Sequence, residues 1–277
     1  MKTDIIEKNM KDTQKHYTGD EIKKTRQSSS IGLIIRQKEP SNLETPFDQV
    51  DSFLTPTELF YIRSHFPAPK LNLASYQLRI DGAVRNPFSL SYQELRDMPS
   101  ETRVATLECA GNGRVFLIPH VEGAQWELGA VGNAEWTGVP LGALLERAGM
   151  EEDACEIVLE GADQGTPDVK PMPPGPISYA RSLPRDKAIQ PEVLIAYQMN
   201  GRDLPQDHGY PVRAIVPGHL WNGFRQVADT YPRCARAVSR LLADIRLRLL
   251  GLSGWKARAA RIGRNEAEVR DRSTNCL

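Results

Sequence analysis

The sequence predicts an α+β fold built of mixed sheets with short helices, and three observations support this prediction. Apolar and polar residues alternate over residues 76–82 and 102–107, which is typical of strands with one buried face. Short helical segments with recognisable ends lie between such stretches. No strict strand–helix–strand rhythm and no internal repeat is visible, so a doubly wound parallel sheet is not expected.

The first elements of the globular part follow a polar lead. Residues 1–38 are polar and mixed in charge, and we expect them to be disordered. Residues 55–58, TPTE, predict a capped turn, and residues 76–82 predict a strand that ends at a turn. Residues 91–95, SYQEL, predict a short helix that begins at a capping serine.

The later elements surround a cysteine. The strand predicted over residues 102–107 leads directly to Cys109. Residues 139–149 predict a helix with proline in its first turn and glycine at its end. Residues 157–161 predict another strand, with Asp163 in the turn that follows it.

Composition and cysteine usage limit the class of protein. A length of 277 residues with 40% hydrophobic content is enough for one or two domains with a sizeable core. The four cysteines show no CxxC or CxxH spacing, which argues against a zinc site or a disulfide framework and favours the cytoplasm. The apolar stretch at residues 31–35 is too short for a signal or a span, so we expect neither export nor a membrane partner.

The net charge of zero hides an asymmetry between two parts of the chain. Residues 219–277 carry 12 Lys and Arg against 5 Asp and Glu, and 11 of those 12 cations are Arg. The first 218 residues carry the remaining 23 cations and 30 anions. Such an abrupt change of composition separates a basic tail from an acidic body.

The most informative string is ATLECAGNGR at residues 105–114, which contains Cys109. A soft thiolate suits a transition metal, and a Gly-rich turn lets a bulky group approach the backbone. A buried, inert cysteine is the alternative. The string resembles the molybdenum-ligating loop of the sulfite oxidase family of molybdopterin enzymes. The resemblance implies that Cys109 is a catalytic residue and the metal ligand, with Mo-molybdopterin as the cofactor.

A second string, FYIRSHFP at residues 60–67, resembles the segment of that family that precedes the pterin. The resemblance implies that Tyr61, Arg63, Ser64 and His65 contact the cofactor and that Arg63 is a catalytic residue beside the metal. The planar, permanently charged fork of arginine suits a tetrahedral oxyanion such as sulfite. Taken without the resemblance, a solvated arginine and a satisfied histidine in a strand remain possible.

Further strings complete the implied cofactor site. The resemblance implies that Asp163 accepts from the pterin ring, and that His208 and Arg213, in DHGYPVRAIVPG at residues 207–218, meet the pterin and its phosphate. Alone, these residues are an ordinary turn aspartate and surface cations. Residues 129–138 are Gly-rich without GxGxxG spacing, so we expect them to pack beneath the cysteine loop rather than bind a dinucleotide.

The resemblance covers roughly two thirds of the chain and predicts a molybdopterin-binding domain over residues 39–218. It stops there, and the C-terminal part of the family's fold is expected to be incomplete. Removing one nucleotide near the codon of Leu220 allows a reading that contains the family's Val-Lys-Trp strand and a later segment with tyrosine. Residues 219–277 are therefore hypothesised to be translated out of frame. The alternative is a real basic amphipathic helix near residues 236–246.

The implied function is oxygen-atom transfer to sulfite or a similar oxyanion, with electrons passed to an external acceptor. The family's active-site tyrosine and the lysine that meets the cofactor phosphate are expected to be missing, so activity could be impaired. A methionine sulfoxide reductase-type molybdoenzyme and a non-enzymatic remnant whose basic tail binds acidic partners are the alternatives. No nucleic-acid partner is expected, and the oligomeric state is left open.

Overall fold

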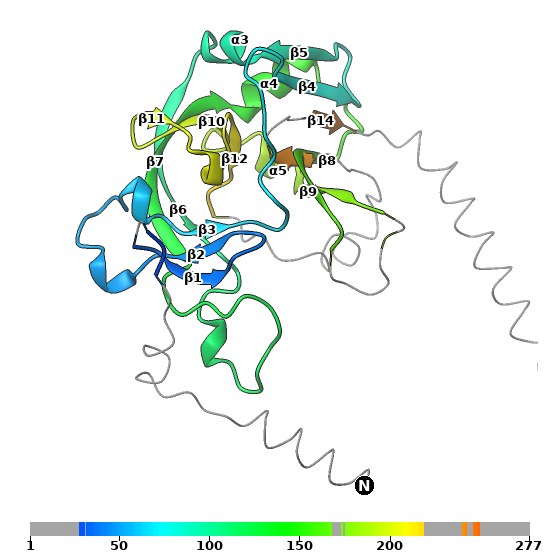
Figure 1. Cartoon of the computed structure of the whole chain (residues 1–277). Coiled ribbons are helices and arrows are strands. Elements are labelled where there is room, and N and C mark those ends of the chain that lie inside the picture. The colour runs from blue at the N-terminus through cyan, green and yellow to red at the C-terminus, as the bar shows by residue number, and fades with distance from the viewer. Residues whose placement is uncertain are drawn as a thin grey trace, which may run out of the picture.

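A computed structural model gives the architecture (Figure 1). The structure describes residues 28–30, 32–167, 173, 175–218, 240–242 and 246–249. These residues form three sheets and a few short helices, which confirms the predicted α+β class. Among them, no helix is long and apolar enough to cross a membrane.

The cysteine loop follows the last residue of β6 (Glu101–Glu108), an edge strand of a five-stranded sheet. The sheet has the order β11 (Arg202–Asp203), β10 (Leu194–Met199), β7 (Val131–Pro140) and β6, and β12 (Arg213–Ile215) also pairs with β10. All of these pairings are antiparallel. The β6–β7 pairing is unbroken from Glu101↔Gly138 to Glu108↔Val131, so the end of β6 is held in a fixed place.

A mixed six-stranded sheet lies on the other side of the molecule (Figure 1). Its order is β5 (Phe88–Ser91), β4 (Gln77–Gly82), β14 (Arg246–Leu249), β13 (Arg240–Leu242), β8 (Glu156–Gly165) and β9 (Ile177–Pro184). The pairings of β14 with β4 and of β13 with β8 are parallel, and the remaining pairings are antiparallel.

Strands β13 and β14 belong to the segment predicted to be a basic tail. Where the structure describes that segment it is strand, so the alternative of an amphipathic helix near residues 236–246 is wrong for residues 240–242 and 246. Strand pairing uses backbone groups that every non-proline residue carries, so the side-chain pattern of this segment did not reveal it. The rest of residues 219–277 lies outside the described residues.

A three-stranded antiparallel sheet contains β1 (Ile34–Gln37), β2 (Asn42–Glu44) and β3 (Ile62–Arg63). Strand β1 corrects the prediction that residues 1–38 are disordered, because Ile34, Ile35 and Gln37 pair with β2. Ile34 and Ile35 are the last two residues of the apolar stretch that was too short for a membrane span, and they begin this edge strand. Residues 1–27 lie outside the described residues.

The helices begin and end as the sequence predicts. Helix α3 (Tyr92–Arg96) has the predicted capping serine: the Ser91 hydroxyl accepts from the Glu94 amide, and the Glu94 carboxylate accepts from the Ser91 amide. Helix α4 (Leu141–Ala148) follows Pro140 and ends at Gly149, whose φ of 65° is left-handed. Within the described residues, the other helices are α5 (Arg185–Ala188) and four 3-10 turns, η1 (Phe47–Gln49), η2 (Thr57–Leu59), η3 (Arg114–Phe116) and η4 (Gln206–His208).

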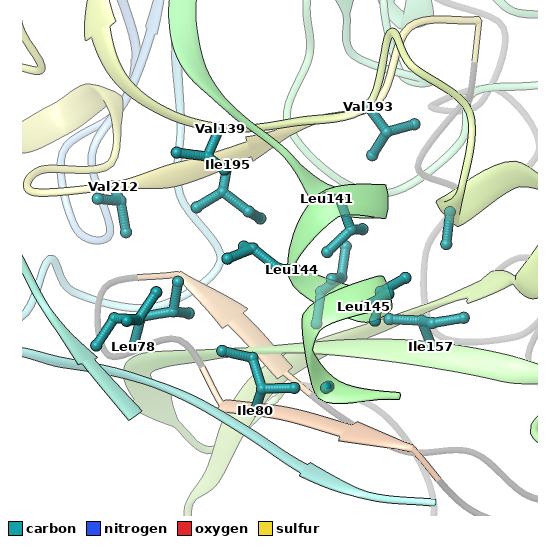
Figure 2. Packing of buried hydrophobic residues seen from close by; sticks show 14 of the residues in the cluster. Leu78, Ile80, Val139, Leu141, Leu144, Leu145, Ile157, Val193, Ile195 and Val212 are labelled. Atoms are coloured by element: carbon teal, nitrogen blue, oxygen red, sulfur yellow. The ribbon is translucent and has the colours of Figure 1, made fainter. Parts of the chain in front are cut away.

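The larger apolar core lies between helix α4 and the sheets. Figure 2 shows Leu141, Leu144 and Leu145 of α4 directed toward side chains from β4, β8 and β10. Leu144 is fully buried there. A smaller cluster around Phe60 and Trp136 packs the β6–β7–β10 sheet against the segment that leads to β3. The candidate site lies next to this smaller cluster.

Candidate active site

Cys109 occupies the first position after β6, where the chain turns sharply. Its amide donates to the Ala130 carbonyl (2.9 Å), its carbonyl accepts from the Asn112 amide (2.8 Å), and the Gly111 amide lies 3.4 Å from its Sγ. The Asn112 side chain donates to the Glu108 carboxylate (2.9 Å). The loop is therefore fixed by its own hydrogen bonds, and the thiol is half-buried.

The cysteine loop also rests on residues 126–130, the segment just before β7. The Gly113 amide donates to the Glu127 carbonyl (2.6 Å), and the Asn112 side chain accepts from the Ala130 amide (3.0 Å). Gly113 has a φ of 76°, which glycine adopts without strain. The predicted packing of the Gly-rich segment beneath the loop is thus present in the structure.

Arg63 is the last residue of β3, and His65 lies two residues later; both side chains lie near Cys109. The Arg63 guanidinium donates to the Asn42 side chain (3.1 Å) and to the Ser64 carbonyl, and its Nη2 lies 3.3 Å from His65 Nδ1. Burial is the main cause that lowers the pKa of Arg63, opposed by the nearby Cys109. Burial, with Arg63 and Arg181 adding repulsion, lowers the pKa of His65 to about 3, so this imidazole is neutral at physiological pH.

Tyr61 lies beside this pair, between aromatic rings. Its ring stacks on Phe60, with centroids 5.3 Å apart, and meets the Trp126 ring edge to face at 6.5 Å. Burial and, next, the Cys109 side chain raise the pKa of Tyr61, so its hydroxyl keeps its proton and can donate a hydrogen bond.

His208 and Arg213 come from η4 and β12. The Arg213 guanidinium donates to the His208 carbonyl (2.9 Å) and lies 5.2 Å from the centre of the Trp136 ring. The His208 ring meets Phe60 edge to face at 5.6 Å. Burial and Arg213 lower the pKa of His208 to about 4, and burial lowers the pKa of Arg213.

Asp163 lies within β8, which corrects the prediction that it follows the strand in a turn. Strand β8 continues to Gly165, with a register shift against β9 between Glu160 and Gln164. Residues 157–161 gave no sign of this irregularity, because a bulge shifts the pairing register without requiring a particular residue type. The strand was therefore predicted to end before Asp163. Asp163 is 6% exposed, and burial raises the pKa of its carboxyl to about 7.

The sequence prediction missed two residues of β9, Tyr179 and Arg181. The Tyr179 ring stacks on His65 with centroids 5.0 Å apart, and the Arg181 guanidinium lies 4.3 Å from the centre of the same ring. Burial raises the pKa of Tyr179. The family's active-site tyrosine was expected after residue 218, so Tyr179 is a different residue and that expectation stays a prediction. Residues 177–184 carry no motif. The one signal that could have indicated Tyr179 is the pairing of its strand, β9, with β8, which contains Asp163.

These side chains line one cavity of about 300 Å³. All eight residues predicted for the site lie in its wall: Tyr61, Arg63, Ser64, His65, Cys109, Asp163, His208 and Arg213. Tyr179, Arg181, Arg114 and Trp126 also line it. Four arginines, Arg63, Arg114, Arg181 and Arg213, line the cavity against three acidic residues, Glu108, Asp163 and Asp207. The excess of positive charge favours an anionic occupant.

The wall of the cavity fits a molybdenum–pterin group. Asp163 Oδ1 and Arg213 Nε are buried and have no hydrogen-bond partner among the described residues, and a ring N–H and an anionic oxygen would satisfy them. Within the same residues, no group of three His, Cys, Asp or Glu side chains is placed to hold a metal ion. A metal bound at Cys109 would therefore need a cofactor that brings most of its ligands.

The fold and the cavity define a domain that binds a large anionic cofactor beside a single cysteine. The sequence matches the family described as "Oxidoreductase molybdopterin binding domain" over residues 65–227, past the predicted boundary at residue 218. The chain belongs to this family, and the implied cofactor, Mo-molybdopterin, is confirmed with it.

Individual relatives agree with the resemblance to sulfite oxidases. The chain is 40% identical to "Sulfite oxidase" of Gallus gallus over 193 residues, covering 68% of this chain and 41% of the relative. It is 38% identical to "Sulfite oxidase" of Arabidopsis thaliana over 195 residues, covering 67% and 49%. The chain thus spans less than half the length of these curated relatives.

A solved structure shares the fold. The sulfane dehydrogenase SoxCD from Paracoccus pantotrophus superimposes with a TM-score of 0.60 at 28% identity, covering 86% of this chain and 53% of that chain. Sheets and short helices of the predicted type are therefore confirmed by both the structure and the comparison.

Proposed function

We propose that this chain is a molybdenum-dependent oxidoreductase that oxidises a small sulfite-like oxyanion. The observation that carries the proposal is one cavity lined by Cys109 together with four arginines. In the overall reaction sulfite and water give sulfate, two protons and two electrons. The electrons pass one at a time to an external one-electron carrier.

The residues of the wall divide into two roles. When bound, the molybdenum–pterin group supplies the two-electron redox and oxygen-transfer chemistry. Cys109 would be its protein ligand to the metal. The residues that would hold the pterin and its phosphate are Tyr61, Ser64, His65, Asp163, His208 and Arg213. Arg63 would contact both the cofactor and the substrate.

Protonation states support this division. His65 and His208 have pKa values lowered to about 3 and 4, so both act as neutral hydrogen-bonding groups at pH 7. Positive charge in the cavity then comes from arginine, which keeps it at every relevant pH. Arg63 would hold the oxyanion, and the burial of its guanidinium strengthens that attraction by excluding water.

The charge of the cavity also favours sulfite over a neutral substrate. A methionine sulfoxide carries no net charge on the sulfoxide group, so it would gain less from the Arg63 guanidinium than an oxyanion does. The sulfite oxidases and the sulfane dehydrogenase among the similar proteins are both named for sulfur compounds. We therefore place the inorganic sulfur oxyanion first and the sulfoxide second.

The proposal is tested by expressing the full chain in a host that makes molybdopterin. We expect a molybdenum-to-protein ratio near one and sulfite-dependent reduction of ferricyanide, and we expect the Cys109→Ala variant to lose both. Faster turnover with methionine sulfoxide and a reduced dye would favour the reductase alternative. A ratio near zero in both proteins would leave the non-enzymatic remnant as the better explanation.

The frame of residues 219–277 is a separate part of the proposal. We infer an out-of-frame origin from the arginine excess and from the family motifs that the codons permitted for these residues allow in the neighbouring frame. Strands β13 and β14 do not oppose it, because strand pairing uses backbone groups whatever the side chains. Resequencing the DNA across codons 217–222 tests the idea, and a coding string without those motifs would overturn it.

We also propose a cytoplasmic location for the protein. Cys109 forms no disulfide within the described residues, which suits a reducing compartment. Fractionation of cells that express the full chain tests this, and recovery of the protein in an exported fraction would contradict it.

A further inference from the structure

A buried group of charges lies behind the cysteine loop, outside the wall of the cavity. It contains Arg36 of β1, Glu44 at the end of β2, and Glu127. The Arg36 guanidinium donates through Nε to the Glu44 carboxylate and through Nη2 to the Glu127 carboxylate. Glu44 is 1% exposed. A carboxylate buried this deeply is stable only if every lone pair is used.

Glu44 uses its remaining lone pairs on the segment that supports the cysteine loop. Its Oε1 accepts from the Gly129 amide (2.7 Å), and its Oε2 accepts from the Glu127 amide (3.1 Å). The neighbouring Thr45 amide donates to the Gly129 carbonyl (3.2 Å). A Cβ at Gly129 would lie 1.9 Å from the Thr45 carbonyl oxygen, so only glycine fits this seat.

The opposite edge of the same segment holds the cysteine. The Ala130 carbonyl accepts from the Cys109 amide (2.9 Å), and the Glu127 carbonyl accepts from the Gly113 amide (2.6 Å). Residues 127–130 therefore lie between Glu44 on one side and the cysteine loop on the other. No other described carboxylate bonds to the amides of both Glu127 and Gly129.

We propose that Glu44 is a positioning residue for the Cys109 thiol. Its carboxylate holds residues 127–130 in place, and the hydrogen bonds of these residues hold the cysteine loop, and so the Cys109 thiol, in position before any cofactor binds. Hydrogen bonds from backbone amides to a carboxylate are stronger than those between neutral groups, so they suit a segment that has to keep the cysteine loop in one position. The proposal rests on the proposed role of Cys109 as metal ligand, but the position of the thiol can be measured without a metal.

The test compares alkylation of Cys109 by iodoacetamide in the cofactor-free full chain, read peptide by peptide by mass spectrometry. Cys155, which is half-buried as Cys109 is, serves as the internal reference. We expect Glu44→Ala to raise the Cys109-to-Cys155 rate ratio about tenfold, equivalent to about 1.4 kcal/mol of easier loop opening. Glu44→Gln, which keeps one acceptor oxygen, should give a smaller rise.

Ser91→Ala is the matched control, because it destabilises the protein by removing a bond between Ser91 and Glu94 at the surface and should leave the ratio unchanged. A ratio within twofold of wild type for the Glu44 variants, or an equal rise in Ser91→Ala, would overturn the proposal. If Glu44→Ala does not fold, Glu44→Gln decides alone: a rise of threefold or more supports the proposal, and a smaller one opposes it.

A second measurement separates this proposal from the proposed function. In cells that make molybdopterin, Glu44→Gln should lower the molybdenum-to-protein ratio, and Cys109→Ala should abolish it. If Cys109→Ala retains molybdenum, the assignment of the ligand fails, whereas the alkylation result for Glu44 still stands. If Cys109→Ala loses molybdenum and Glu44→Gln changes neither readout, only the positioning role fails.

Discussion

The apolar core around Leu144 and the cavity around Cys109 are both buried, but they are built from opposite kinds of residue. The core is aliphatic and is supplied by α4 and the strands that face it (Figure 2). The cavity wall contains Asp163, Arg181 and His208, which are 5–7% exposed. Apolar contacts stabilise without regard to direction, whereas buried polar groups need particular partners. Stability is therefore concentrated in one region and chemistry in the other.

The largest effect should come from Cys109→Ala, which changes chemistry and not the core. We expect the molybdenum-to-protein ratio to fall from near one to near zero. The midpoint of thermal unfolding of the cofactor-free protein should move little, because the thiol interacts with the Gly111 amide (3.4 Å) and with the Arg63 guanidinium at the cavity and not with the apolar core. Elemental analysis and calorimetry measure the two quantities. Cys155→Ala is the control and should keep its molybdenum.

Leu144→Ala should do the reverse. Removing a fully buried leucine is expected to lower the free energy of unfolding by about 2–5 kcal/mol. Denaturant titration of the cofactor-free protein measures this loss. The folded fraction should still bind molybdenum at the wild-type ratio. A variant that loses molybdenum without losing stability would contradict the separation of the two regions.

Arg63→Lys should affect substrate more than fold. The variant keeps a positive charge but loses the fork that suits an oxyanion, so we expect kcat/KM for sulfite to fall about ten- to a hundredfold. Molybdenum content should persist. Arg103→Lys is the matched control, because Arg103 is exposed and pairs with Glu101 at the surface. Equal losses in both variants would argue against a role of Arg63 at the substrate.

The cavity should also control the response of the cofactor-free protein to pH. His65 and His208 have pKa values lowered to about 3 and 4, so the unfolded chain binds more protons and these groups make stability rise from pH 4.5 to 6.5. Asp163, whose pKa is raised to about 7, acts in the opposite direction, because its folded form binds the proton more tightly.

Asp163→Asn should therefore steepen the rise of stability with pH. The slope is expected to increase by at most about 1.4 kcal/mol per pH unit between pH 4.5 and 6.5. Denaturant titrations across this range measure it. Asp48→Asn, at an exposed position, should leave the slope unchanged. A wild-type slope in Asp163→Asn would show that the carboxyl does not titrate as its burial requires.

Ser91→Ala should give the smallest effect, because it removes a cap at the surface of the apolar region. The loss of the capping bond to the Glu94 amide is expected to cost about 1 kcal/mol of unfolding free energy. Molybdenum content and sulfite kinetics should not change. A loss of cofactor in this variant would show that the two regions are more strongly coupled than their contacts indicate.

Local pattern was enough for the elements whose energetics are local. The ends of α4 follow from Pro140 and Gly149, and the cap of α3 follows from Ser91, because capping acts within one turn of a helix. The same reasoning failed at β8, where a bulge carried the strand past the predicted end to Gly165. It also failed at β1, since an edge strand of four residues resembles a polar lead.

The sequence by itself determined the chemistry of this protein: a cysteine in a Gly-rich turn, arginines and histidines in separate strings, and a family that joins them. Only the tertiary structure decided that Tyr179 and Arg181 share the cavity and that Glu44 supports the cysteine loop from behind. Residue type and spacing are carried along the chain. Contacts between β2, the loop after β6, and β9 join residues far apart in sequence, and such contacts exist only once the sheets have formed.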